Sequence, residues 1–246
     1  MLKQSKSTLL PTSNRPLLHF LQCERYPVLD QLLLEETLLR TTTQNWCLIN
    51  RGSSPAIVFG ISGRVNDHLS APSPFPLIRR YSGGGTVVVD EDTLFVSLIF
   101  QKADGPSPCY PEPVLRWSAH LYQEAFALPG FALKENDYVI DSRKCGGNAQ
   151  YFQKHRFVHH TTFLWDYTTN RMNKLLFPPK TPAYRQDRPH GAFLCRLKDY
   201  FPSQNLLIDS ILSTLSHFYT LKKHSSLPTL APSCRLSTRI IEQPLK

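Results

Sequence analysis

One stretch of the chain decides the fold: Arg79-Arg80-Tyr81-Ser82-Gly83-Gly84-Gly85-Thr86-Val87-Val88-Val89-Asp90. Three of the 11 glycines stand in a row, with two arginines before them and a β-branched run after them. Glycines let a backbone approach a ligand closely, and successive N–H groups can converge on an anion. The β-branched residues predict a strand that holds the loop. The stretch therefore indicates an anion-binding loop leading into a strand; a flexible glycine turn of a hairpin is the alternative interpretation.

The length and charge of the chain limit its class. The 246 residues fit one domain, with or without a small appendage. Lys and Arg number 28 against 19 Asp and Glu, a net charge of +9, which suits an acidic partner or an anionic substrate. The basic residues form no block of the kind that binds nucleic acid, and no apolar run is long enough to span a bilayer. We therefore expect neither a nucleic-acid partner nor a membrane partner.

The cysteines and the N-terminus bear on the compartment. No two of the six cysteines have the CxxC spacing of a zinc or redox pair. The N-terminus lacks the apolar core of a secretory signal, so a reduced, cytoplasmic protein is expected. Residues 1–16 contain Lys3, Lys6 and Arg15 but no acid, which is the composition of a short organelle-targeting presequence. A frayed terminus is the other interpretation; a presequence would make the protein mitochondrial.

The hydrophobic pattern predicts a strand-rich domain. Strands are expected over residues 17–23, 46–50, 56–60, 86–89, 94–101, 138–140, 147–152 and 156–165. Helices are expected over residues 28–40, 114–128, 170–177, 192–201 and 205–221. In the first helix, Glu36 falls on the apolar stripe and Glu35 falls off it. Successive strands without intervening helices argue against a parallel βαβ sheet.

The same pattern predicts the domain organisation. A flexible N-terminal extension is expected over residues 1–16 and the main domain over residues 17–221. Residues 222–246 contain three prolines and little apolar periodicity, so we expect a basic tail that is partly ordered at best.

A second glycine-containing segment runs Asp141-Ser142-Arg143-Lys144-Cys145-Gly146-Gly147-Asn148-Ala149-Gln150. Lys144 stands between a polar turn and a Gly-Gly pair. A lysine held there can place a point charge on a carboxylate, carbonyl or phosphate oxygen. A solvated lysine in a turn is the alternative. A second basic, glycine-rich loop in a chain that already has one favours a binding site.

Two further features adjoin that segment. His159 and His160 lie in a predicted strand, so their side chains point to opposite faces and cannot hold one metal ion together. We expect one of them to contact a ligand and the other to be packed or solvated. Asp137, after Asn136, offers a carboxylate to Mg²⁺, which prefers oxygen ligands, and we assign it as a metal ligand. A plain turn before the strand at residue 138 is the alternative.

Both motifs, in this order and at this separation, resemble the lipoate–protein ligase family, which belongs to the superfamily of biotin and lipoate ligases and octanoyltransferases. The family's glycine-loop motif is roughly R-R-x-S/T-G-G-G-A/T-V-x-x-D, and residues 79–90 match it. Its lysine motif is roughly R-K-x-x-G-S/N-A-Q followed by H-H-x-T, and residues 143–150 and 159–162 match it. The resemblance covers residues 18–201. It implies an α+β fold with a mixed, mostly antiparallel β-sheet flanked by helices, like biotin ligase catalytic domains.

The resemblance also implies an ATP-dependent ligase. A lipoate carboxylate attacks the α-phosphate of ATP, giving lipoyl-AMP and pyrophosphate, and a lysine amine of an acceptor domain then releases AMP. Lys144 would be catalytic. The acyl-adenylate would be bound by Arg79, Arg80, Ser82, Gly83, Gly84, Gly85, Thr86, Val87, Lys144 and His160. Fixed cations and N–H donors would stabilise the charge that develops on the phosphoryl and acyl oxygens.

Some positions depart from the family pattern. Val89 stands where the family has His, Asp30 where many members have Asn, and Cys145 where an aliphatic residue is common. About 45 residues follow Phe201, too few for an independent core. We therefore expect a catalytic domain without the C-terminal accessory domain of larger ligases. A partner subunit for adenylation, or the use of pre-formed lipoyl-AMP, is an open alternative to adenylation by the chain itself.

Two other functions stay open, and the partners follow from the resemblance. Related octanoyltransferases use a cysteine ahead of the lysine segment, where this chain has Phe131-Ala132-Leu133 and no cysteine. A non-catalytic binder of lipoylated domains would keep the fold and lose the chemistry; the retained lysine and arginines argue against it. The expected partners are acidic lipoyl domains of 2-oxoacid dehydrogenases and the glycine-cleavage carrier protein, whose docking a charge of +9 would favour.

Overall fold

The computed structural model describes residues 15–69, 72–167, 181–228 and 235–242. Within them an eight-stranded sheet has the order β11-β1-β2-β6-β10-β9-β8-β7, and a four-stranded sheet has the order β12-β4-β3-β5. The strands are β1 (Leu17–Glu24), β2 (Asn45–Arg51), β3 (Ala56–Phe59), β4 (Leu77–Arg79), β5 (Val87–Val89), β6 (Thr93–Gln101), β7 (Phe131–Lys134), β8 (Asp137–Ile140), β9 (Arg143–Phe152), β10 (Arg156–Leu164), β11 (Thr220–His224) and β12 (Arg239–Ile241). The helices are α1 (Val28–Thr41), α2 (Pro111–Phe126), α4 (His190–Phe193) and α5 (Gln204–Ser216).

Most neighbouring strands run antiparallel. In the large sheet β1 is parallel to β2 and to β11, and the other described pairs are antiparallel. In the small sheet β3 and β4 are parallel, whereas β12 and β5 are antiparallel to their neighbours. This mixed, mostly antiparallel arrangement confirms the α+β fold class predicted from the sequence.

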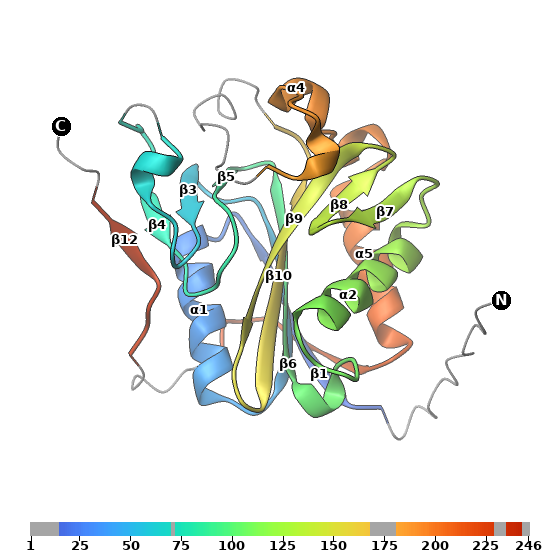
Figure 1. Ribbon diagram of the computed structural model, residues 1–246. Helices are drawn as coiled ribbons and strands as arrows, with labels where there is room; N and C mark the ends of the chain where they lie inside the picture. Colours follow the sequence, from blue (N-terminus) through green and yellow to red (C-terminus); the bar gives the residue numbers. More distant parts are fainter. Residues whose placement is uncertain (1–14, 70–71, 168–180, 229–234, 243–246) are drawn as a thin grey trace.

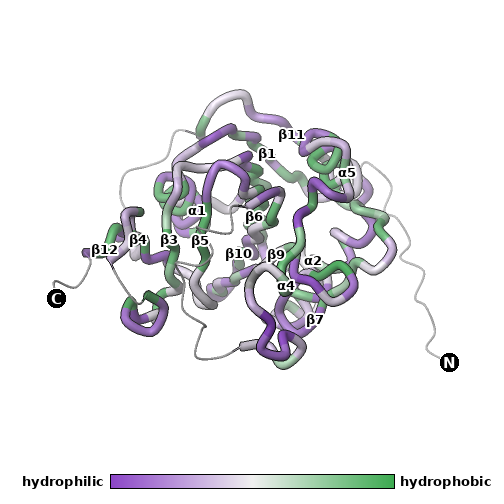
Figure 2. Tube along the Cα trace, turned by 90° about the horizontal axis from the view of Figure 1, so that it is seen from above, coloured by the Kyte–Doolittle hydropathy of each residue, from purple (hydrophilic) through white to green (hydrophobic). Residues whose placement is uncertain are grey.

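The large sheet separates two layers. Figure 1 shows α2 and α5 on one side of it and α1 with the small sheet on the other, and Figure 2 shows the same layers from above. Strand β6 explains the arrangement because successive side chains point to opposite faces. Leu94 and Leu98 join the cluster under α2 and α5, whereas Phe95 and Ile99 join the cluster under α1. A strand that is apolar on both faces is buried on both.

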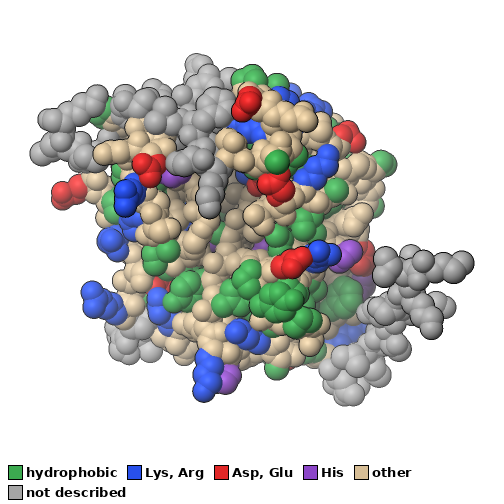
Figure 3. Space-filling model, in the orientation of Figure 1, with side chains coloured by type: hydrophobic (Ala, Val, Ile, Leu, Met, Phe, Trp, Pro, Cys, Tyr) green, Lys and Arg blue, Asp and Glu red, His purple; other side chains and the backbone are tan. Residues whose placement is uncertain are grey.

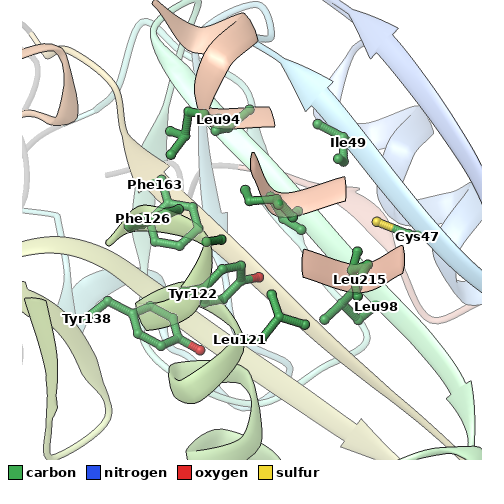
Figure 4. Close-up of a cluster of buried hydrophobic side chains, with 14 of the residues drawn as sticks. Cys47, Ile49, Leu94, Leu98, Leu121, Tyr122, Phe126, Tyr138, Phe163 and Leu215 are labelled. Carbon is green, nitrogen blue, oxygen red and sulfur yellow. The ribbon is translucent and has the colours of Figure 1, made fainter. Parts of the chain in front are cut away.

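The cluster between the large sheet and helices α2 and α5 is rich in aromatic rings (Figure 4). Tyr122 and Phe126 of α2 meet Phe163 of β10 and Tyr138 of β8. The ring centroids of Tyr122 and Phe163 are 4.8 Å apart and nearly perpendicular, the edge-to-face contact that aromatic quadrupoles favour. These contacts hold α2 against the strands β8 to β10, which carry the lysine motif.

Helix ends follow local chemistry. Helix α2 begins at Pro111, three residues before its predicted start, because proline is well suited to the first helical turn. It ends where Ala127 takes a left-handed conformation with φ of 47°. At the start of α5, the Ser203 hydroxyl accepts a hydrogen bond from the Leu206 N–H at 3.3 Å. No helix of the described residues is long and apolar enough to cross a membrane.

Several predicted elements differ from the observed ones. The predicted helix over residues 205–221 ends at Ser216, and β11 follows it as an edge strand beside β1. The predicted helix over residues 192–201 is broken because the Cys195 N–H donates to the Lys144 carbonyl at 2.9 Å and so cannot bond within a helix. Strand β7 was not predicted; it has only four residues. The helix predicted over residues 170–177 lies outside the described residues.

The predicted basic tail contributes to both sheets. Strand β11 crosses the predicted boundary at residue 221, and β12 pairs with β4. Just before β12, the N–H groups of Ser237 and Thr238 donate to the Glu36 carboxylate at 2.8 and 2.9 Å. This part of the tail is thereby anchored to α1. Residues 1–14 of the predicted N-terminal extension lie outside the described residues.

Helix α1 is buried on nearly every side. Glu35 and Glu36 are both 0% exposed, so the expectation that Glu35 lies off the buried face was wrong. The reason is the second sheet: Val58 of β3 and Ile78 of β4 pack in the same cluster as α1. They cover a side of α1 that a single sheet would leave in water. Each buried carboxylate therefore needs its own hydrogen-bond donors.

We predict that Glu36→Ala releases β12 from β4. The variant removes the acceptor for two backbone N–H groups and the partner of Arg40. We expect a loss of about 1–3 kcal/mol in the free energy of unfolding and faster hydrogen exchange over Arg239–Ile241. The exposed pair of Glu112 and Arg116 supplies the control, since Glu112→Ala should change neither quantity measurably. Unchanged exchange in β12 of the Glu36→Ala protein would contradict the anchoring.

Candidate functional site

The glycine loop, residues 80–86, joins β4 to β5 and has an open outer surface. Gly84 and Gly85 are exposed, and Gly84 has a φ of +91°, a conformation that favours glycine. A Cβ atom on Gly83 or Gly85 would meet no atom within 4 Å. A Cβ atom on Gly60, in contrast, would lie 2.2 Å from the Gly84 carbonyl oxygen. Gly60 therefore allows a backbone contact that fixes the position of the loop.

Both arginines of the motif bind backbone carbonyls. Arg80 is 5% exposed and donates to the Ser82 hydroxyl at 3.0 Å and to the Gly85 carbonyl at 2.9 Å, with a further bond to Gly83. Burial lowers the pKa of its guanidinium to about 10, so it stays charged at neutral pH. Arg80 thus braces the loop from inside instead of facing its open surface.

Arg79 is half-buried and clamps the neighbouring loop. Its Nη1 donates to the carbonyl oxygens of Gly60, Ile61 and Gly63 at 3.1, 3.0 and 2.7 Å. The guanidinium holds its positive charge at the loop's edge, where it also lowers the cost of binding an anion nearby.

Thr86 and the valines after it complete the loop. The buried Thr86 hydroxyl oxygen has no hydrogen-bond partner among the described residues, which suits contact with a ligand. Val87 is half-buried against the cluster under α1. Val89, where the resemblance expects His, is 1% exposed and points into that cluster. The departure at Val89 therefore removes no polar group from the open face of the loop.

A β-bulge aims Lys144 at the same region. Tyr138 pairs with Gly146 and Val139 pairs with Lys144, so Cys145 is one extra residue in β9. Cys145 is buried in the core cluster, and a Cβ atom on Gly146 would point at Phe163. The Lys144 ammonium lies on the opposite face, where it would contact a Cβ atom on Gly147 at 3.3 Å. The strand predicted from residue 147 therefore begins earlier, at Arg143, and the alternative of a lysine in a turn was wrong.

Lys144 is paired with Asp137. Lys144 Nζ and Asp137 Oδ1 are 2.7 Å apart, and the lysine side chain is 26% exposed. The other carboxylate oxygen accepts a hydrogen bond from the Tyr184 hydroxyl at 2.9 Å. Desolvation, with the Asp137 carboxylate adding to it, raises the pKa of Tyr184, so its hydroxyl stays protonated as a donor. Tyr184 was not predicted as a site residue because it is remote in sequence from both motifs.

The structure brings the two motifs side by side along β9. Gly84 of the glycine loop packs on Ala149. A Cβ atom added to Gly84 would lie 3.4 Å from the Cβ atom of Ala149. Ala149 pairs with His160 on β10, and Gly147, two residues before Ala149 on β9, contacts Lys144. The glycine loop, Lys144 and His160 therefore border one region, and their role in binding a ligand stays a prediction.

The two histidines point to opposite faces, as predicted. His160 lies between the glycine loop and α1: its Nε2 is 2.8 Å from the Ser82 hydroxyl and its Nδ1 is 2.8 Å from Glu35 Oε2. His159 is buried among core residues, 2.9 Å from the Tyr138 hydroxyl and 3.0 Å from the Gln150 side chain. His160 thus borders the candidate site, and His159 belongs to the core.

The described residues do not form a magnesium site of their own. Among them no three His, Cys, Asp or Glu side chains gather in a way that could hold a metal ion. Asp137, the predicted ligand, has both carboxylate oxygens engaged by Lys144 and Tyr184. A magnesium ion there would have to displace the Lys144 ammonium, so we derive no chemical step through it.

We predict that Gly60→Ala destabilises the protein and Gly83→Ala does not. A Cβ atom on Gly60 would force the Gly84 carbonyl away, whereas Gly83 has open space around that position. Overpacking of this kind typically costs about 1–3 kcal/mol in the free energy of unfolding. Urea unfolding of the two variants checks the difference. Equal stability of both variants would argue against a close contact between Gly60 and the loop.

We also predict that His159 makes stability depend on pH. Burial, with a smaller effect of His160, lowers the pKa of His159 to about 3, whereas the unfolded chain binds the proton near pH 6.5. This contribution to stability is therefore complete above pH 6.5 and is lost as the pH falls, by at most about 1.4 kcal/mol per pH unit. His159→Gln should flatten the unfolding free energy between pH 6.5 and 5. Equal slopes for the variant and the wild type would contradict a buried, neutral His159.

Comparisons with known proteins agree with this geometry. Residues 27–219 match the family model described as the lipoyl protein ligase A/B catalytic domain. The chain is 28% identical over 274 aligned positions to the inactive lipoate–protein ligase 2 of Plasmodium falciparum, covering 84% of this chain and 71% of that protein. It is 34% identical over 122 positions to the lipoate–protein ligase LplJ of Bacillus subtilis, covering 46% of this chain and 35% of that protein.

Solved structures share the fold. The bipartite lipoate–protein ligase of Thermoplasma acidophilum superposes with a TM-score of 0.67 at 16% identity, over 86% of this chain and 88% of that one. A lipoate–protein ligase A bound with ATP superposes with a TM-score of 0.63 at 16% identity, over 86% and 90%. At 16% identity, these two structures establish a shared fold only. The family model matches most of the chain and establishes the family. The chain therefore belongs to the lipoyl protein ligase A/B catalytic-domain family.

Proposed function

We propose that the protein attaches lipoate to a lysine of an acceptor domain in an ATP-dependent reaction. In the first step a carboxylate oxygen of lipoate bonds to the α-phosphorus of ATP, and pyrophosphate leaves. In the second step a neutral lysine amine of the acceptor bonds to the acyl carbon, AMP leaves and the amine loses a proton. Family membership and the neighbouring glycine loop and Lys144 support this proposal.

The observation that carries the proposal is the position of Lys144. A lysine ammonium is a compact point charge, and this one lies beside Gly147, one residue from the contact between Asn148–Ala149 and the glycine loop. Asp137 neutralises it in the structure at 2.7 Å. An incoming lipoate carboxylate or adenylate phosphate is also an anion, so it can take the place of Asp137 as the partner of Lys144. The ammonium would then stabilise charge on the acyl and phosphoryl oxygens.

The glycine loop would bind the phosphate of the acyl-adenylate. Its exposed glycines leave the backbone open to a phosphate. The Thr86 hydroxyl, which has no hydrogen-bond partner among the described residues, would supply a donor. Arg79 holds its charge at the loop's edge. Arg80 would act indirectly, through the shape of the loop. The ATP-bound lipoate–protein ligase A with the same fold supports ATP as the substrate for this chain.

Acceptor lipoyl domains are the proposed partners. The Thermoplasma ligase described above was solved in a study of that enzyme and its E2 lipoyl domain, and it is bipartite. By analogy, this chain would act on acidic lipoyl domains or on a glycine-cleavage carrier, with or without an accessory subunit. In Figure 3 Lys and Arg side chains are spread over the visible face with Asp and Glu between them. A net charge of +9 would steer an acidic domain from a distance.

A second candidate function is transfer from a lipoyl group that is already activated. The similarity to a protein named an inactive ligase favours testing transfer apart from adenylation. Pre-formed lipoyl-AMP would enter the same site. Transfer through a cysteine thioester is less well supported, because Cys145 is buried in the core on the face opposite Lys144 and its pKa is raised by burial.

We predict that Lys144→Ala abolishes acceptor modification. The loss of a charged contact in the transition state should lower the rate by about a hundredfold or more. The intact mass of an apo lipoyl domain, mixed with lipoate and ATP or with pre-formed lipoyl-AMP, measures the reaction and separates the two candidate functions. Lys154→Ala is the control, since Lys154 is exposed in the turn between β9 and β10. Wild-type activity of the Lys144→Ala protein would refute the assignment of Lys144.

A further inference from the structure

Two buried side chains, Glu35 and Ser82, and the partly buried His160 form a continuous chain of hydrogen bonds from α1 to the glycine loop. Glu35 Oε2 is 2.8 Å from His160 Nδ1, and His160 Nε2 is 2.8 Å from the Ser82 hydroxyl. Glu35 and Ser82 are 0% exposed, and the His160 side chain is 11% exposed. The order carboxylate, imidazole and hydroxyl is that of a catalytic triad. Here, however, the hydroxyl is buried and already accepts a bond from Arg80 at 3.0 Å, so it is not placed as a nucleophile.

The carboxylate of Glu35 is held in its charged form. It accepts hydrogen bonds from Ser97 at 2.5 Å and from Gln31 at 2.8 Å, besides the bond from His160. Burial by itself raises the pKa of Glu35, but the His160 imidazole and these hydrogen bonds lower it overall. An ionised carboxylate can only accept hydrogen bonds. His160 Nδ1 must therefore carry a proton and donate it to Glu35.

The other nitrogen of His160 then sets the direction of the Ser82 hydroxyl. In the neutral imidazole Nε2 has no proton and can only accept, so the Ser82 O–H points at it. The Ser82 oxygen keeps its lone pairs for Arg80, which also binds the carbonyls of Gly83 and Gly85. The protonation of one ring nitrogen is thus linked to the hydrogen bonds that shape the glycine loop.

We propose that Glu35 is a positioning residue: it fixes His160 as the Nδ1–H tautomer and, through Ser82, holds the glycine loop in its observed shape. In the opposite tautomer Nε2–H would donate to Ser82. The Ser82 oxygen would then face two donors, and its own hydrogen would need an acceptor elsewhere. The loop would lose the arrangement in which each polar group has a partner. The consequence for activity rests on the proposed function, whereas the tautomer and the loop shape do not.

The test is Glu35→Gln, which keeps the shape of the side chain and replaces one acceptor oxygen by a donor. Ser97 and Gln31 donate to Glu35 Oε1, so the amide oxygen of the new side chain would occupy that position. Its amide nitrogen would then face His160 Nδ1 and donate to it, which favours the proton on Nε2. Nitrogen-15 NMR of the imidazole rings reports the tautomer directly, and the His160→Gln protein identifies the signals of His160. We expect Nδ1–H in the wild type and Nε2–H in the variant. We also expect hydrogen exchange over residues 82–86 to be at least about tenfold faster in the variant, a change of about 1.4 kcal/mol.

Glu36→Gln is the matched control. Glu36 is the next residue of α1 and equally buried, but its carboxylate is bound by Arg40, Ser237 and Thr238. The Glu36→Gln variant should show the same nitrogen signals of His160 as the wild type. A merely structural effect of losing a buried charge would alter both variants alike, and the same tautomer in wild type and Glu35→Gln would overturn the proposal.

Ser82→Ala tests the other end of the chain and does not depend on the folding of the Glu35→Gln protein. It should retain the Nδ1–H tautomer, because Glu35 is intact, and it should accelerate exchange in the loop. A change of tautomer in Ser82→Ala, or unchanged loop exchange, would overturn the proposal. In the acceptor-mass assay Glu35→Gln should lower the transfer rate about tenfold or more. A wild-type protein without transfer would refute the proposed function and leave the NMR and exchange results to decide the role of Glu35.

Discussion

The bulge at Cys145 is the constraint on which the rest of the candidate site depends. A regular β9 would place Lys144 and Gly146 on one face and Cys145 on the other. The extra residue lets Cys145 and Gly146 both face the core, while Lys144 and Gly147 face the glycine loop. The absence of a side chain on Gly147 leaves room for the Lys144 side chain. Asp137, the cross-strand partner of Gly147, supplies the counter-charge to Lys144. One inserted residue thus aligns a cation with the loop.

The second organising feature is the burial of α1 between two sheets. Such a helix gains apolar contacts on both sides, but its two adjacent glutamates lose water. The fold offsets that loss by using each carboxylate as a connector. Glu36 binds the backbone before β12, and Glu35 binds side chains of β6 and β10. Charges that would be a cost in a plain core here tie distant segments together.

The glycine loop is held on the side that faces the protein interior and is open on the side that faces solvent. Arg80, Ser82 and His160 occupy its inner side, and the backbone of Gly60 limits its position. Gly83 and Gly85 have open space on the side where a Cβ atom would stand. Preorganisation of this kind matters for chemistry on anionic intermediates, since fixed donors need not rearrange as charge develops. It also explains why a motif with two arginines uses one of them entirely for support.

The sequence by itself determined much of the fold class and the pair of motifs. The strongly apolar run over residues 94–101 marked a buried strand, and residues 79–90 and 143–150 carried the family resemblance. Periodicity could not reveal that β11 and β12 would form, because their residues gain stability from hydrogen bonds to β1 and β4 that are remote in sequence. Nor could it show that Arg80 points inward or that Tyr184 reaches Asp137. Those roles depend on which backbone and side-chain partners surround a residue, and only the tertiary structure brings these partners together.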